Sequence, residues 1–411
     1  MNISPYSLQK FQFIQNFRNN LARFSFFILY LCERVPIKAQ ENKSLIDMTK
    51  KGIIMLLLLF VAFAGRAQIK VEVSETVELM AILSRTAGFQ EYCMDMGGQY
   101  TKDTEAWFAP YKSHSIVKYY QDLRAKYGIS HDAVMTMAIH LAIDGGKLKM
   151  MADEAGPLDR WRNVDVDSFV VRLNQFYADT RFHDFYKQHQ PFYEEVMRTY
   201  EANVMPHFHQ GWYARFYGTE PTEKFRIVIG FTNGGGNYGP SRQLKGQPRE
   251  VFAIASYYVD PQTGKSYEDG MSYASTLIHE FNHSFVNPLI ENETNAALLK
   301  DIGRNLLMLS PIGMKRQNYA QWNIVLNESV VRAAVIIYML DNGYSSEQLR
   351  QEMFDQVCRD FRWMPELVTA LRRYASNRDQ YPTLNSFYPE VAKCLSNFLD
   401  KEAERMDKPL Q

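Results

Sequence analysis

The 411-residue sequence has no excess of charge of either sign, because 46 Lys and Arg residues stand against 46 Asp and Glu residues. A general nucleic-acid binder would carry a basic excess, and an acidic disordered chain would carry the opposite, so this balance argues against both classes. Glycine (22 residues) and proline (16 residues) are too scarce for a fibrous or low-complexity protein. Hydrophobic residues, at 46%, suffice for a folded core.

Cysteine is also scarce, with Cys32, Cys93, Cys358 and Cys394 scattered along the chain. They are too few for a disulfide scaffold, and none forms the CxxC pair of a structural zinc site. Cys358 and Cys394 could still pair in an oxidising compartment. The chain lacks GxSxG and GxxxxGK[ST], so the sequence predicts neither a serine-hydrolase elbow nor a phosphate-binding loop.

Residues 48–67 have the pattern of a secretory signal peptide. Two lysines precede an uncharged apolar run of 12 residues, Ile53–Ala64, and small residues that suit a cleavage site come after it. A membrane anchor is the alternative, but this run is shorter than the roughly 20 residues needed to cross a bilayer. We therefore expect translation to start at Met48, with residues 1–47 as an upstream extension, and the product to be secreted or periplasmic.

Loss of residues 1–67 changes the charge balance. That segment contains 9 Lys and Arg and 3 Asp and Glu, so 37 basic and 43 acidic residues remain, a net charge of −6. The mature chain is then mildly acidic, which strengthens the prediction that it has no nucleic-acid partner. We expect no stable membrane insertion after cleavage. The sequence does not indicate an oligomeric state.

The rest of the chain predicts an α+β fold that is mainly α-helical. Residues 68–220 form a helical N-terminal region, and no clear linker separates it from residues 221–411, so we expect it to be a fixed part of the catalytic domain. The apolar periodicity and the capping residues predict helices over 75–85, 114–126, 130–143, 166–182 and 191–204. The third of these is expected to end at Gly145-Gly146.

Residues 221–411 form the predicted catalytic region, which begins with two strands. Residues 224–232 and 250–259 are rich in β-branched and aromatic side chains, as strands are. The turn-rich loop 233–239 comes after the first of them, so we expect an antiparallel hairpin or a small antiparallel sheet. From residue 273 onward the pattern is helical again.

A motif that carries chemistry lies in this second helical part. His279-Glu280-Phe281-Asn282-His283 is an HExxH sequence inside an apolar helix expected over 273–287. Residues four apart lie on one helix face, so both imidazoles can reach one metal ion, with Glu280 beside it. The alternative is a pair of ordinary helix histidines that flank a glutamate. We expect Pro288 to end the helix.

A catalytic zinc ion usually takes three protein ligands, so a further ligand is needed. The extended HExxHxxGxxH pattern is excluded, because Val286 and Leu289 occupy its glycine and histidine positions. Glu291 and Glu293 compete for the role, although a helix that ended at Pro288 would turn the chain away before them.

Glu328 is the predicted third ligand, 45 residues after His283 and preceded by Asn327. It lies in a strongly apolar helix expected over 326–340, where a glutamate needs a reason to be present. A second helix packed against the HExxH helix could bring it to the metal. The alternative is an acid that merely favours the positive end of a helix N-terminus.

HExxH on one helix and Asn327-Glu328 on a later one resemble the gluzincin, or thermolysin-like, zinc metallopeptidases. This resemblance covers two helices. More broadly, the chain resembles an uncharacterised bacterial family of secreted HExxH proteins with unknown function. Thermolysin-like enzymes often carry an aspartate four residues after the ligand glutamate, where it orients the first histidine, whereas this position is Arg332 here. The groups that orient the histidines must therefore come from elsewhere.

The resemblance implies a zincin-like fold, in which an extended substrate lies along an edge strand beside the active-site helix. Residues 224–232 or 250–259 could be this edge, and loop 233–239 could border the cleft. The loop could equally be a plain hairpin connection, because glycines also serve turns.

These patterns together predict a secreted zinc-dependent peptidase that acts on peptides or proteins. His279, His283 and Glu328 would bind Zn²⁺, and Glu280 would act as the general base. The candidates for stabilising the developing oxyanion are Tyr273, Tyr319, Arg332 and Tyr338. The alternatives are a zincin-fold metallohydrolase acting on a non-peptide amide and a non-catalytic secreted binding protein of the same fold. The intact Glu280 argues against the last.

Overall fold

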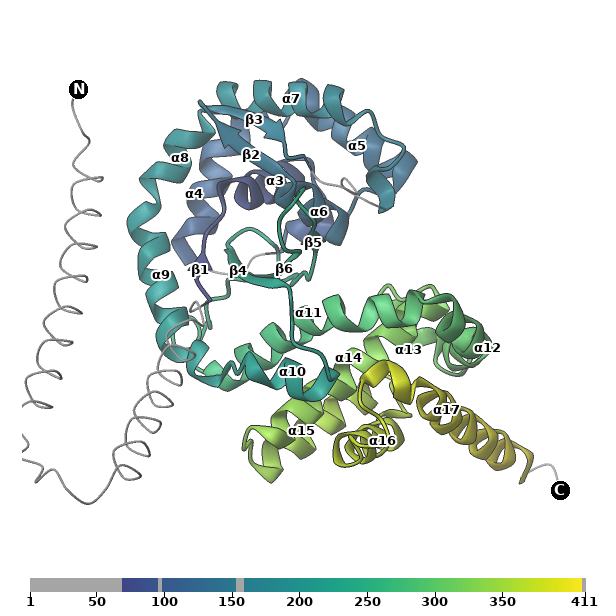
Figure 1. Cartoon of the computed structure of the whole chain (residues 1–411). Coiled ribbons are helices and arrows are strands. Elements are labelled where there is room, and N and C mark those ends of the chain that lie inside the picture. The colour runs from purple at the N-terminus through teal and green to yellow at the C-terminus, as the bar shows by residue number, and fades with distance from the viewer. Residues whose placement is uncertain (1–68, 95–97, 153–158, 409–411) are drawn as a thin grey trace, which may run out of the picture. The chain divides into compact units, whose positions relative to one another are not determined.

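The computed structural model describes residues 69–94, 98–152 and 159–408. The expected upstream extension, 1–47, and signal peptide, 48–67, lie outside these residues. The described part belongs to one compact unit, Ile69–Gln411, which is mainly helical and contains two small sheets (Figure 1). The predicted class, α+β and mainly α, is confirmed.

The first half of this unit is built largely from helices. They are α3 (Glu75–Thr86), α4 (Gly98–Phe108), α5 (Ser115–Tyr127), α6 (Asp132–Ile139), α7 (Val166–Asp179), α8 (Phe182–Gln188), α9 (Gln190–Asn203) and α10 (Gly211–Tyr217). The predicted helices that correspond to α3, α5, α7 and α9 are confirmed. Their starts depend on local chemistry: the Ser74 side chain, for example, caps α3 by accepting a hydrogen bond from the Val77 amide.

The helix predicted over 130–143 was wrong over its last four residues. Helix α6 ends at Ile139, and the chain then forms an antiparallel hairpin of β2 (Leu141–Asp144) and β3 (Lys147–Met150). Gly145 and Gly146 make its two-residue turn with φ values of 56° and 77°. A turn with positive φ at both central positions favours Gly-Gly, so this pair joins two strands and does not end a helix.

The larger sheet has four strands in the order β1-β4-β6-β5. They are β1 (Val71–Glu72), β4 (Lys224–Gly230), β6 (Glu250–Ser256) and β5 (Ser241–Arg242). Strands β1, β4 and β6 run parallel, and β5 runs antiparallel to β6. The predicted antiparallel hairpin of residues 224–232 and 250–259 was therefore wrong.

The connection between β4 and β6 explains the difference. The chain leaves β4, passes to the far side of β6, and runs back along β6 from the bridge Tyr238↔Ile254 through β5. It then turns into β6, which consequently has the same direction as β4. Every residue of β6 is buried, as is typical of parallel strands covered on both faces.

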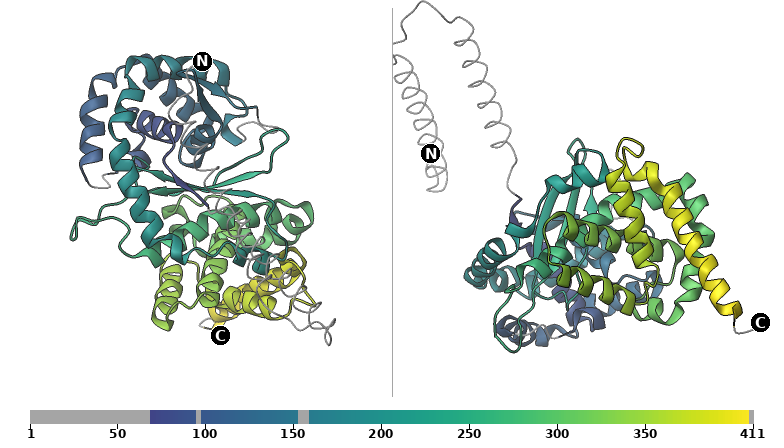
Figure 2. Two further views of the ribbon diagram at one scale, coloured as in Figure 1. Left: turned by 60° about the vertical axis from the view of Figure 1, so that its left-hand side comes forward. Right: turned by 90° about the horizontal axis from the view of Figure 1, so that it is seen from below.

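Helices cover both faces of this sheet (Figure 1; Figure 2, left). Helices α3 and α6 lie on one side, and α11 with the C-terminal helices lies on the other. These helices are α11 (Gly270–Glu291), α12 (Glu293–Leu309), α13 (Pro311–Arg316), α14 (Trp322–Asp341), α15 (Ser346–Cys358), α16 (Met364–Ser376) and α17 (Leu384–Asp407).

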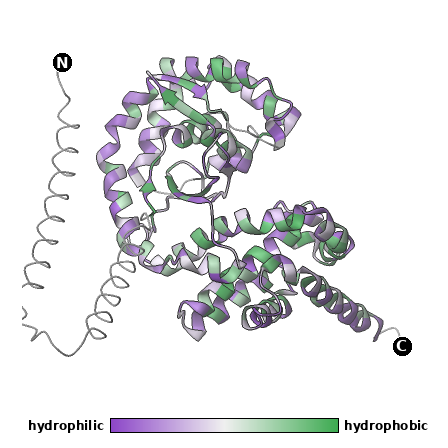
Figure 3. Cartoon of the chain, viewed as in Figure 1, coloured by the Kyte–Doolittle hydropathy of each residue, from purple (hydrophilic) through white to green (hydrophobic). Residues whose placement is uncertain are grey.

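Helix α14 is the centre of the C-terminal layer. Within the described part of the chain it is the one helix with the length and apolar character to cross a membrane, but 83% of its apolar window is buried in the protein. It packs against α11, α12, α15 and α16, and Figure 3 shows its largely hydrophobic residues among the more mixed helices around it. A position inside the core accounts for its composition.

A buried carboxyl group joins the N-terminal helices to the sheet. Glu78 on α3 is fully buried and accepts hydrogen bonds from the Phe231 amide (2.7 Å), the Tyr100 hydroxyl (2.9 Å) and the Thr232 hydroxyl (3.3 Å). Burial raises the pKa of Glu78 to about 7, although these hydrogen bonds oppose the shift. The group therefore changes charge near neutral pH in the folded protein.

We expect Glu78→Gln to remove a pH dependence of stability. The pKa of Glu78 is about 7 in the folded protein and near 4.5 in the unfolded chain. The stability that the protonated carboxyl group contributes is therefore fully present below pH 4.5 and is lost as the pH rises through 7. This difference in pKa corresponds to about 3 kcal/mol of the free energy of unfolding. Urea unfolding of both proteins at pH 5 and pH 8 should show the wild type losing more stability than the variant. Equal losses would contradict the assignment.

Candidate metal centre

Helix α11 presents the HExxH motif in its middle turns. The Asp269 side chain caps its first turn by accepting from the Ser272 amide (3.2 Å). Asn282, inside the motif, is fully buried, and its side chain accepts a hydrogen bond from the Tyr217 hydroxyl (2.9 Å) and donates one to the Val331 carbonyl (3.5 Å). These bonds fix the rotation of α11 against α10 and α14, which sets the direction of the two histidines.

The helix does not end at Pro288, contrary to the prediction, but continues to Glu291. Proline has no N–H to donate to the Ser284 carbonyl four residues before it, and that carbonyl accepts instead from Nη1 of Arg249 (3.4 Å). Glu291 and Glu293 are exposed, and neither belongs to the cluster of metal-ligating groups on α11 and α14.

The structure brings His279, His283 and Glu328 together, as α14 packs across α11. The Nε2 atoms of the two histidines are 3.2 Å apart. His283 Nε2 lies 3.4 Å from Glu328 Oε1, and His279 Nε2 lies 3.6 Å from Glu328 Oε2. A tetrahedral zinc ion with bonds of about 2.0–2.1 Å separates neighbouring ligand atoms by about 3.3 Å. Because each histidine faces a different oxygen of Glu328, the cluster offers two imidazole nitrogens and one carboxylate at spacings close to those of such a site.

The protonation states of these groups suit a cation. Burial lowers the pKa of His279 well below its usual range and outweighs the opposing effect of Glu328, so its imidazole is neutral. For Glu328, burial opposes ionisation, but the positive charge of Arg332 is the largest effect in the other direction, and the pKa of Glu328 is lowered to about 2. The cluster thus offers imidazole nitrogens and one carboxylate, a donor set that zinc accepts.

Glu280 lies beside this cluster and is only 7% exposed. Burial, and then the negative charge of Glu328, raise the pKa of Glu280 to about 8. A carboxyl group with a pKa near the working pH can both take up and release a proton. A bound cation would lower the pKa of Glu280.

The groups beside the predicted ligands differ from those of the gluzincin enzymes that the sequence motifs resemble. His283 Nδ1 lies 3.2 Å from Oδ1 of Asn287, one turn further along α11, a partner that fixes the imidazole for metal binding. Asn287 was not predicted from the sequence, although its position four residues after the second histidine was a signal. Arg332, four residues after Glu328, donates from Nε to Glu328 Oε2 (3.0 Å).

The four candidates for oxyanion stabilisation are now separable. The Tyr338 hydroxyl donates to the His207 carbonyl and accepts from the His209 amide, and Tyr273 packs against the ring of Tyr267. Arg332 is buried and directs its N–H groups at other protein groups. Tyr319, whose hydroxyl accepts from Arg332 and also hydrogen-bonds Glu328, remains at the cluster.

One edge of the sheet lies beside α11. This edge is formed by residues 238–242, which lead into and include β5. Residues 224–232 and 250–259 are not edges, because β4 and β6 are interior strands. A Cβ at Gly239 would overlap the Glu280 carbonyl oxygen, and Arg249 joins the Ser241 hydroxyl (2.8 Å) to the Ser284 carbonyl. Gly239, at the end of the loop, and the start of β5 therefore lie against helix α11 at the HExxH turns.

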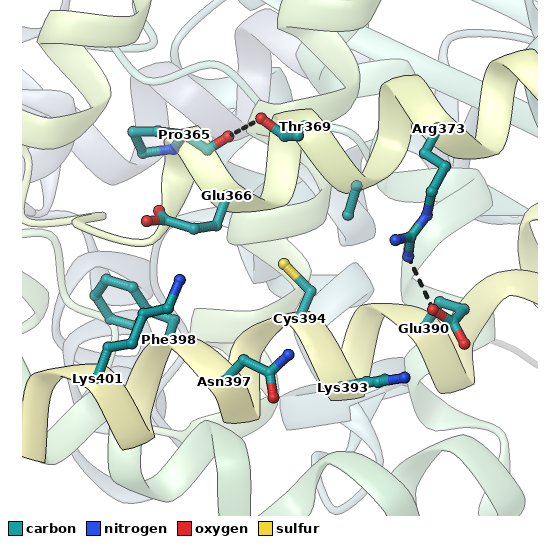
Figure 4. A pocket seen from close by; sticks show the side chains of 11 residues that line it. Pro365, Glu366, Thr369, Arg373, Glu390, Lys393, Cys394, Asn397, Phe398 and Lys401 are labelled. Atoms are coloured by element: carbon teal, nitrogen blue, oxygen red, sulfur yellow. Dashed lines mark hydrogen bonds and ion pairs between the residues drawn. The ribbon is translucent and has the colours of Figure 1, made fainter.

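Two further features lie outside this centre. Cys358 and Cys394 are both free thiols, so they do not form the disulfide that the sequence left open. A hollow of about 420 Å³ lies between α16 and α17, with Cys394 directed into it and an Arg373–Glu390 ion pair (2.8 Å) at its side (Figure 4). It shares no residue with the metal cluster.

Residues 69–394 match the family described as a domain of unknown function, DUF4932. The match spans most of the chain, which therefore belongs to this family. No curated protein and no solved structure matches the sequence.

We expect the wild-type chain to bind one zinc ion and Glu328→Ala to lose most of this affinity, because the substitution removes one of three ligands. Zinc content after gel filtration, together with competition against a chromophoric chelator, measures the effect. The double variant Glu291→Ala/Glu293→Ala removes the two competing but exposed carboxylates and should bind zinc as the wild type does. Retained zinc in Glu328→Ala would remove this residue from the site.

Proposed function

We propose that this protein is a secreted zinc-dependent metallopeptidase with a gluzincin-like active site in a zincin-like fold. The observation that supports this proposal best is the convergence of His279, His283 and Glu328 from two helices. The two Nε2 atoms are 3.2 Å apart, and each faces one oxygen of Glu328 at 3.4 or 3.6 Å. The signal-peptide pattern at residues 48–67 supports export to the periplasm or beyond. Peptides or proteins, not nucleic acids, are the proposed substrates.

The residues divide into ligands, base and positioning groups. His279, His283 and Glu328 would hold zinc, which supplies Lewis acidity and an activated water molecule when bound. Glu280 accepts a proton from the attacking water and delivers it to the leaving amine, a role that its raised pKa suits. The Tyr319 hydroxyl is the proposed donor to the oxyanion, and in that role it exchanges its hydrogen bond to Glu328 for one to the oxyanion.

The sheet edge beside α11 supplies a binding surface for an extended peptide. Tyr238 exchanges both backbone hydrogen bonds with Ile254, and the Pro240 carbonyl accepts from the Phe252 amide. By the alternation of an antiparallel ladder, the N–H and C=O groups of Gly239 and Ser241 point away from β6. A substrate strand can pair with them next to Glu280, with little demand on its side chains.

We expect Glu280→Gln to abolish cleavage of a peptide library while zinc content stays near that of the wild type. Loss of a general base lowers kcat by roughly 10²- to 10⁴-fold. Glu291→Gln, on the same helix but exposed, is the matched control and should retain activity. Zinc bound without cleavage by the wild type would favour a hydrolase of non-peptide amides, and a wild-type chain without zinc affinity would leave only a binding protein of this fold.

The proposed strand pairing predicts a backbone-specific effect at Ser241. Ser241→Pro removes the outward N–H and should lower kcat/KM for peptides about two- to tenfold, the value of one hydrogen bond. Ser241→Ala keeps the N–H and loses only the bond to Arg249, so it serves as the control. Equal effects of the two substitutions, at unchanged zinc content, would show that peptides do not pair with this edge.

A further inference from the structure

Arg332 lies behind the metal cluster and is almost completely buried, at 6% exposure. Its Nε and Nη2 atoms both reach Glu328 Oε2, at 3.0 and 2.9 Å. Nη2 also donates to the Tyr319 hydroxyl (3.0 Å), and Nη1 donates to Gln356 Oε1 (3.0 Å). Three hydrogen bonds and the ion pair with Glu328 thus direct the guanidinium at protein groups, so this buried arginine does not contact substrate.

The contacts with Arg332 make the two oxygens of the Glu328 carboxylate unlike. Oε2 accepts the Nε–H bond and lies in the ion pair with Nη2, and it is also 3.6 Å from His279 Nε2. Oε1 faces His283 Nε2 at 3.4 Å. Oε1 is therefore the oxygen that the arginine leaves more open to a cation.

The guanidinium is itself held in one position. Gln356 on α15 accepts from Nη1 and in turn donates to Glu352 (2.5 Å). The guanidinium also lies over the Phe361 ring, with its central carbon 5.0 Å from the ring centroid. Arg332 is therefore a rigid planar fork, which a flexible lysine would not reproduce.

We propose that Arg332 is the positioning residue that holds Glu328 in place through Oε2, so that Oε1 can bind the metal ion. This proposal rests on the metal-binding part of the proposed function and not on the identity of the substrate. In thermolysin-like enzymes an aspartate orients a histidine ligand. Here an arginine at the same sequence position would instead orient the glutamate ligand.

The proposal opposes a simpler electrostatic role. If Arg332 only neutralised Glu328, its removal would leave a full negative charge for the cation and would tighten zinc binding. If Arg332 positions the carboxylate, its removal frees Glu328 to rotate and weakens zinc binding. The two roles thus predict changes of opposite sign.

The test measures zinc dissociation constants of the full mature chain by competition with a chromophoric chelator, with no enzyme assay. Arg332→Met, similar in length but uncharged, should raise the dissociation constant about 10- to 100-fold, the usual effect of losing a group that orients a metal ligand. Arg332→Lys should recover only part of this loss. Cobalt(II) spectra of the same variants should change in band position, because the ligand set is altered.

Arg226→Met is the matched control, since Arg226 forms ion pairs with Glu72 and Glu250 in the sheet, away from the cluster. It should leave zinc affinity unchanged. Tighter or equal zinc binding by Arg332→Met would overturn the proposal. If that variant does not fold, Gln356→Leu decides: a severalfold weaker affinity supports the positioning role, and an unchanged affinity overturns it. A wild-type chain that binds no zinc would instead defeat the proposed function itself.

Discussion

The ion pair between Glu328 and Arg332 is the interaction on which the candidate centre depends. Both groups lie inside α14, a helix that is otherwise apolar and buried almost throughout. A single charge in such a place would be very costly, and the pair is tolerable only because its hydrogen bonds extend to Tyr319 and Gln356. This network keeps a carboxylate ionised in the core, at the point where α14 crosses the HExxH helix.

The second constraint is the contact between α11 and the edge of the sheet. Gly239 allows the chain to pass against the Glu280 carbonyl, and Arg249 uses the carbonyl that Pro288 leaves free. Helix α11 and the edge segment from Gly239 to Ser241 are thereby held against each other. The N-terminal helices pack on the opposite face of the sheet. There Glu78 accepts a hydrogen bond from the Phe231 amide, just after the end of β4.

Local patterns were predictable where they determine structure over a few residues. The apolar periodicity of α3, α5 and α9, and the four-residue spacing of His279 and His283, depend on neighbours along one helix. The errors arose where a pattern fits two structures. Two glycines can end a helix or turn a hairpin, and two apolar strands can pair in either direction when the intervening loop is long enough to cross over. Pro288 stays within α11 because Arg249, distant in sequence, satisfies the orphaned carbonyl.

The sequence by itself determined that one helix would present two imidazoles and a glutamate on adjoining turns, because helix geometry alone sets that spacing. It also indicated that Glu328 needed a partner, since a charged group in an apolar helix must be compensated. Only the tertiary structure decided which atoms meet. The distance from Glu328 to the histidines, the buried arginine behind it and the edge beside Glu280 all depend on how α11, α14 and the sheet pack, and packing is a property of the whole core.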